Sequence, residues 1–246
     1  MLTGLELFFS LLIVVAASTV IGTVGFGFGL VAIPVLLLYL EPQQAVVVSN
    51  CLIGIVMAMA LVRTWRHLQL RASIGLVVGG IVATPIGVLA LNSASPSALR
   101  ITIAVVIIFL GLFSLSSVDL PFAKRRPAGL IFGFLTSLAV TTIGIGGPLG
   151  AIYAIAQGWK PETVRAGLAL FFLTSDIVAF GLYAATGLVG RDTLANIGVM
   201  IPGLAIGFGL AALLVTRIND RIFRYAVVAV IVVAGSVTLL REFTGV

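Results

Sequence analysis

Two short glycine-rich stretches, residues 23–29 (TVGFGFG) and residues 141–148 (TTIGIGGP), decide how this chain is organised. Each of them interrupts an otherwise apolar run. Glycine frees the backbone from helical dihedrals, and a proline such as Pro148 lacks an N–H and suits the first turn of a new helix. Both stretches therefore predict a break between two helices.

The two breaks occupy matching positions in an internal repeat. When the chain is shifted by 119 residues, the first break falls on the second, and Pro42 falls on Pro161 without a gap. Agreement at glycine and proline, the residues least easily exchanged, favours duplication over chance similarity between apolar stretches. We expect three parts: a first repeat, 1–117, a cytoplasmic connecting loop, 118–127, and a second repeat, 128–246.

The composition is that of a membrane protein from end to end. Of 246 residues, 61% are hydrophobic and 9% are charged, whereas a soluble domain needs far more polar surface. The net charge of +6 lies in short connections between apolar segments, so it indicates membrane topology and not nucleic-acid binding. The apolar segments are 5–24, 27–40, 44–64, 72–92, 98–116, 128–143, 146–157, 162–188, 193–216 and 221–240.

The basic residues discriminate between two arrangements of the repeats. If 5–24 and 27–40 together cross the membrane once, the repeats are parallel, and the 14 Lys and Arg residues divide eight to six between the two sides. If these segments form a hairpin that enters and returns, the repeats are inverted and the division is eleven to three. Because Lys and Arg concentrate in cytoplasmic loops, the charge count favours the inverted arrangement.

We therefore predict an all-α polytopic membrane protein with two inverted repeats of about five helical elements each. The first pair of elements in each repeat is a broken helix or hairpin with a glycine-rich tip. Both termini are expected outside, and the loops expected in the cytoplasm are 63–71, 117–127, 157–165 and 217–224.

The two breaks also predict an anion site. A helix that begins at a break offers free N–H groups and a partial positive charge. Unwound backbone at membrane depth is tolerated only against protein or a watery cavity, and inverted repeats bring the two tips together near the midplane. The residues expected to bind the anion are Thr23, Gly25, Gly27, Gly29, Thr141, Thr142, Gly144, Gly146 and Gly147. Isolated glycines such as Gly79, Gly207 and Gly209 are expected to serve close helix packing instead.

Two polar residues lie deep inside apolar segments. Asp176 falls within 162–188, where an ionised carboxylate is costly, so it is a candidate for carrying a coupling proton. The alternative places it near an aqueous mouth or a basic partner. Asn50, within 44–64, would either donate to the anion or bond a neighbouring helix. With a single histidine and a single cysteine, the chain is expected to hold no metal ion and no cofactor.

The motifs 25–29 (GFGFG) and 144–148 (GIGGP), near the starts of two repeats in a chain of this length, resemble the sulfite exporter TauE/SafE family. Its members are also described as 4-toluene sulfonate uptake permeases. The resemblance implies movement of small sulfur-containing or carboxylate anions across the bacterial cytoplasmic membrane, coupled to an ion gradient. It points to the glycines of the two motifs as functional residues.

These observations lead to one favoured function and two alternatives. The favoured function is a secondary transporter that moves sulfite, an organosulfonate or a small carboxylate by alternating access, with ion or proton coupling. A passive anion channel remains an alternative. An intramembrane enzyme is disfavoured because it needs a nucleophile with a base, or paired acids, at depth. The expected partners are the small anion, the lipid bilayer and a second copy of the chain in a homodimer.

Overall fold

Every regular element that the structure describes is a helix. The computed structural model describes residues 2–113, 121–125 and 127–214. The predicted segment 221–240 and the loop 217–224 lie outside the described residues, as do residues 118–120 and 126 of the predicted 118–127 connection. The α-helices are α1 (Gly4–Val24), α2 (Phe28–Leu36), α3 (Pro42–Thr64), α4 (Leu70–Ser93), α5 (Pro96–Phe113), α6 (Ala128–Ile143), α7 (Gly147–Ala156), α8 (Pro161–Ala185) and α9 (Arg191–Leu214).

Five of the described helices are long and apolar enough to cross a membrane. They are α1, α3 with the short turn that follows it (Pro42–His67), α4, α8 and α9. Large apolar side chains such as Leu12, Val82 and Ile206 are exposed on these helices, where a soluble protein would carry polar residues. The chain is therefore an all-α, multi-pass membrane protein.

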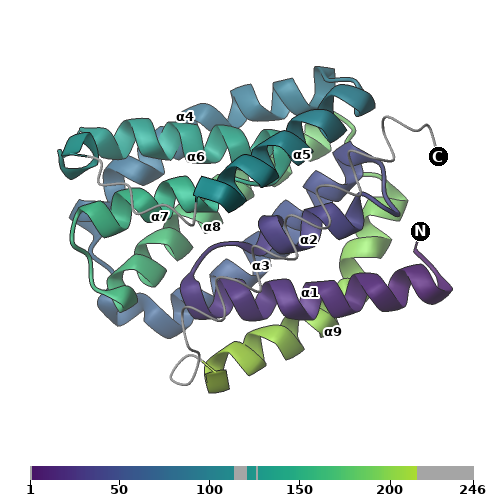
Figure 1. The fold of residues 1–246 in the computed structure, drawn as a ribbon, viewed down its shortest axis with the longest axis horizontal. Coiled ribbons are helices and arrows are strands. Elements are labelled where there is room, and N and C mark those ends of the chain that lie inside the picture. The colour runs from purple at the N-terminus through teal and green to yellow at the C-terminus, as the bar shows by residue number, and fades with distance from the viewer. Residues whose placement is uncertain (1, 114–120, 126, 215–246) are drawn as a thin grey trace.

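The helices of the two halves pack in matching pairs. As Figure 1 shows, α4 lies beside α6 along one edge of the molecule and α1 lies beside α9 along the opposite edge. The helices α3 and α8 cross between these edges, together with the short helices α2 and α7. The first helix of each half thus packs against the fourth helix of the other half.

Close contacts fix the directions of these helices. In the pair α4 and α6, Gly75 faces Gly129, and Gly87 faces Thr141 twelve residues further along both helices, so the two run parallel. The contact between α3 and α8 is the opposite case. Asn50 bonds Tyr183, whereas Gly54, one turn later on α3, faces Asp176, which is earlier on α8. The corresponding helices α3 and α8 of the two halves therefore run antiparallel.

Glycines allow the paired helices to approach closely. A Cβ added at Gly79 would fall on the carbonyl oxygen of Leu130, and one at Gly207 would fall on that of Val15. The packing role predicted for these two glycines is confirmed. For Gly209 it is not confirmed, because a Cβ there would meet no atom of the described residues within 4 Å. Gly207 and Gly209 are two residues apart on one helix and so face different sides.

The packing of α4 on α6 yields a stability prediction. Gly79→Val should destabilise the protein by about 1–3 kcal/mol, because the added methyl groups overpack against the α6 backbone. Gly209→Val is the matched control, since it makes the same change where a side chain has room. Thermal unfolding of the purified variants in detergent measures the difference. Equal melting temperatures for the two variants would contradict this account of the helix contact.

Candidate functional site

Each predicted break is a tight turn at the end of a long helix. The helix α1 ends at Gly25, with φ 94°, and α6 ends at Gly144, with φ 72°. In both cases the backbone N–H of the glycine bonds the carbonyl four residues earlier at 2.8 Å. Side chains rarely adopt this left-handed conformation, so the geometry explains why glycine occupies the same place in both halves.

After each turn the chain folds back along the helix it has just left. Gly27 lies against Val20 of α1, and Gly146 lies against Val140 of α6. The short helices α2 and α7 begin at these points, and no side chain caps either N-terminus. Because the first N–H groups of a helix lack intrahelical partners, each short helix directs unpaired donors and positive dipole charge towards the break. We call α1 with α2 the first hairpin and α6 with α7 the second hairpin.

The tips of the two hairpins touch. A Cβ added at Gly29, in the first turn of α2, would fall on the carbonyl oxygen of Gly144. One added at Gly147, the first residue of α7, would lie 2.9 Å from the Cβ of Phe26. The start of each short helix thus contacts the break of the other half, and neither position has space for a side chain.

A small cavity lies between the tips, with room for about one water molecule. Five of the predicted anion-binding residues line it: Gly27, Gly29, Gly144, Gly146 and Gly147. The other lining residues are apolar, namely Ile21, Phe28, Leu30, Ile53, Val140, Ile145, Pro148 and Phe172. Since these side chains carry neither charge nor hydrogen-bonding groups, the polar atoms at the cavity wall come from the backbone.

The three predicted threonines have their hydroxyl groups engaged elsewhere. Thr23 and Thr141 donate to carbonyls of their own helices at 2.8 and 2.7 Å, and Thr142 donates to the carbonyl of Gly87 at 3.2 Å. None of the three threonines lines the cavity. Gly25 does not line it either, and it lies against Arg165. A direct contact between these residues and an anion would require a change from this conformation.

Asn50 and Tyr183 hold the second break. The Asn50 amide donates to the carbonyl of Val140 at 3.0 Å and to the hydroxyl of Tyr183 at 2.8 Å, and that hydroxyl donates to the carbonyl of Thr141 at 2.8 Å. Both carbonyls belong to the last turn of α6. That of Val140 also accepts the N–H of Gly144, whereas that of Thr141 lies beyond the last helical N–H and accepts from Tyr183. Asn50 was predicted from the sequence but Tyr183 was not, although a tyrosine in a buried helix needs a hydrogen-bond partner.

Arg165 has the corresponding role at the first break. Its Nη1 donates to the carbonyl of Thr23 at 3.1 Å, and its side chain packs on Gly25. Its Nη2 lies 3.5 Å from a carboxylate oxygen of Glu162, in the first turn of α8. In the register of the repeat, Arg165 corresponds to Val46, which faces the second break. The sequence analysis treated Arg165 only as a loop charge.

Asp176 lies at the crossing of α3 and α8, outside the cavity wall. It is 5% exposed, and a Cβ at Gly54 of α3 would lie 3.2 Å from its Cβ. Neither carboxylate oxygen has a hydrogen-bond partner among the described residues. The described part of the chain therefore supplies no basic partner for this acid. Asp176 and Tyr183, seven residues apart, share one face of α8.

Comparison with known proteins gives a family. The chain matches a protein-family model described as Sulfite exporter TauE/SafE over residues 10–238, a range that contains both breaks and α2–α9. No curated protein matches the sequence. No solved structure matches it either. Because the match covers nearly the whole chain, and because the described helices are those of a multi-pass membrane protein, the chain belongs to the sulfite exporter TauE/SafE family.

Proposed function

We propose that this protein is a secondary transporter that moves a small anion across the membrane by alternating access. The observation that supports this most is the meeting of two uncapped helix N-termini in one cavity. Helix N-termini bind anions through unpaired N–H groups and the dipole, and broken helices in transporters use the same device at the membrane midplane. The family's description supports sulfite as the substrate, and we extend the proposed class to related sulfonates and small carboxylates.

The dimensions of the cavity favour a substrate of few atoms. In this conformation it has room for about one water molecule, far less than the pockets that hold drug-sized ligands. Phe28 and Pro148 narrow it, and Gly29 and Gly147 leave no room for added side-chain atoms between the tips. Binding of a small oxyanion such as sulfite therefore requires the tips to move apart, and a large aromatic sulfonate would require a much larger movement.

We infer that the two halves are inverted repeats. The antiparallel crossing of α3 and α8 supports this, as does the packing of each first helix on the fourth helix of the other half. In such an arrangement the hairpins enter from opposite faces, and rocking of the halves exposes the cavity to each side in turn. The eleven-to-three division of basic residues supports an orientation in the bacterial cytoplasmic membrane with the start of α8 in the cytoplasm and both termini outside.

We propose that Asp176 carries the coupling proton. A buried carboxylate without a partner is costly to charge, so gain and loss of a proton at this site would be tied to a change in its surroundings. Those surroundings include α3, against which Asp176 packs, and Tyr183, which holds the second break from the same face of α8. Through α8 and Tyr183, Asp176 is connected to the second tip, although it does not line the cavity.

Substitutions that place side-chain atoms between the two tips test the proposed anion site. Gly29→Val and Gly147→Val should abolish saturable sulfite uptake into proteoliposomes, because each places methyl groups between the two tips. Both should also remove the rise in melting temperature that sulfite gives the unmodified protein, since a ligand that binds only the folded state stabilises it. Gly181→Val in α8, where a Cβ meets no atom within 4 Å, is the control and should behave like the unmodified protein.

Two results would contradict the proposal. Normal uptake in both tip variants would exclude the cavity as the anion site. Uptake that rises linearly with sulfite concentration and does not respond to an imposed ion gradient would identify a passive channel instead of a carrier.

The role of Asp176 is tested with a change of similar size. Asp176→Asn should stop a pH gradient from driving accumulation of sulfite, while exchange of sulfite across the membrane continues, because the anion site itself is intact. Glu6→Gln alters an exposed acid in the first turn of α1 and serves as the control. The measurement is accumulation in proteoliposomes with and without a pH gradient. Undiminished gradient-driven accumulation in Asp176→Asn would exclude this acid as the proton carrier.

A further inference from the structure

We propose that Arg165 receives the anion at the mouth of the cavity and, by leaving the carbonyl of Thr23, releases the first hairpin to move. This inference rests on the proposed anion site between the tips and adds the residue that controls access to it. It makes Arg165 a substrate-contacting residue during loading and makes the two hairpins unequal, although they derive from one repeated unit.

The first tip is the more open of the two. Phe26 and Gly27 are partly exposed, whereas the corresponding residues of the second half, Ile145 and Gly146, are buried. Gly27 lines the cavity, and Phe26 lies against the first residue of α7. The cavity therefore approaches the surface at the first break, beside the segment that Arg165 holds.

The bond between Arg165 and the first tip can be exchanged for a bond to an anion. The side chain of Arg165 is 21% exposed, and that of Glu162, its carboxylate neighbour at 3.5 Å, is 47% exposed. The acceptor at Thr23 is a neutral carbonyl. A guanidinium binds an oxyanion more strongly than a neutral acceptor, and its planar fork fits two oxygens at once. An arriving sulfite or carboxylate thus competes directly with Thr23.

The second tip offers no such exchange. Its carbonyls are bonded by Asn50 and Tyr183, which are neutral and each 1% exposed. The position that corresponds to Arg165 is Val46, which carries no donor. Arrival of an anion therefore loosens the first hairpin from α8 and leaves the second hairpin fastened to α3 and α8.

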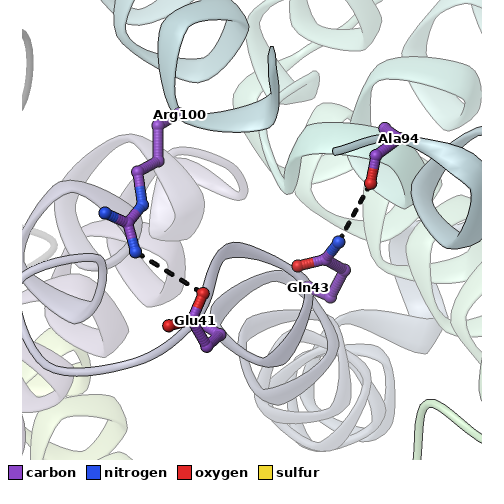
Figure 2. Close-up of polar contacts among 4 residues, drawn as sticks. All are labelled: Glu41, Gln43, Ala94 and Arg100. Atoms are coloured by element: carbon purple, nitrogen blue, oxygen red, sulfur yellow. Dashed lines mark hydrogen bonds and ion pairs between the residues drawn. The ribbon is translucent and has the colours of Figure 1, made fainter. Parts of the chain in front are cut away.

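Transport kinetics test the receiving role. Arg165→Gln should raise the KM for sulfite in proteoliposomes about tenfold or more, because hydrogen bonds to charged groups are worth that much. Arg165→Lys keeps the charge but loses the planar fork, so its KM should be intermediate. Arg100→Gln is the matched control. Figure 2 shows that Arg100 forms an ion pair with Glu41, which directly precedes α3, and the pair has the same N–O distance of 3.5 Å.

Accessibility of the mouth tests the release without any anion. Phe26→Cys, in a Cys51→Ala background, places a thiol at the partly exposed first tip. A membrane-impermeant maleimide applied from the side where α8 begins should label it several-fold faster when Arg165→Gln is added. Adding Arg100→Gln should leave the labelling rate unchanged.

The two measurements separate the possible failures. An unchanged KM together with an unchanged labelling rate in Arg165→Gln would overturn the inference. If Arg165→Gln does not insert into membranes, Arg165→Lys carries both measurements with the same criteria. Faster labelling combined with no sulfite uptake by the unmodified protein would overturn the proposed transport function and, with it, the receiving role of Arg165.

Discussion

Backbone carbonyls at the end of a helix inside a membrane must find donors within the protein, and this requirement organises the structure. Both α1 and α6 end inside the protein, at Gly25 and Gly144. Arg165 satisfies a carbonyl of the first helix, and Tyr183, with Asn50, satisfies those of the second. Since Arg165 lies near the start of α8 and Tyr183 near its end, one helix fastens both breaks.

Each break leaves backbone carbonyls at the end of one helix and backbone N–H groups at the start of the next without helical partners. Only the carbonyls receive hydrogen bonds from side chains. The carbonyls that end α1 and α6 are bonded by side chains, whereas no side chain caps the N–H groups that begin α2 and α7. Unpaired donors at membrane depth are costly unless a ligand or water meets them. The proposed anion site therefore follows from the different treatment of the two kinds of group, with side chains bonding the carbonyls and leaving the N–H groups uncapped. No basic side chain is needed at the cavity wall.

The sequence was sufficient for the helices and for the cavity glycines, because glycine, proline and apolar length act locally. The side chains that donate hydrogen bonds to the helix ends could not be predicted from the sequence. Arg165 and Thr23 are 142 residues apart in the chain, and no local pattern reports such a contact. The threonines were expected to face the anion, but serine and threonine hydroxyls in helices readily bond carbonyls of the preceding turn, and Thr23 and Thr141 do so. The helical periodicity also determines which of two nearby glycines packs. Gly207 lies against α1, whereas Gly209, two residues later, faces another side and meets none of the described residues.

Duplication explains the two tips, and divergence explains why they differ. Two identical halves related by inversion would give inward-facing and outward-facing states of equal energy, because exchanging the halves converts one state into the other. In this chain the register places Arg165 opposite Val46, and Asn50 opposite Ala169. A charged, partly exposed bond therefore holds one tip, while neutral, buried bonds hold the other. In the proposed inverted arrangement, this difference at the tips makes the two states unequal in energy. Under the proposed role of Arg165, binding of the anion at the first tip then supplies the free energy for the change of state.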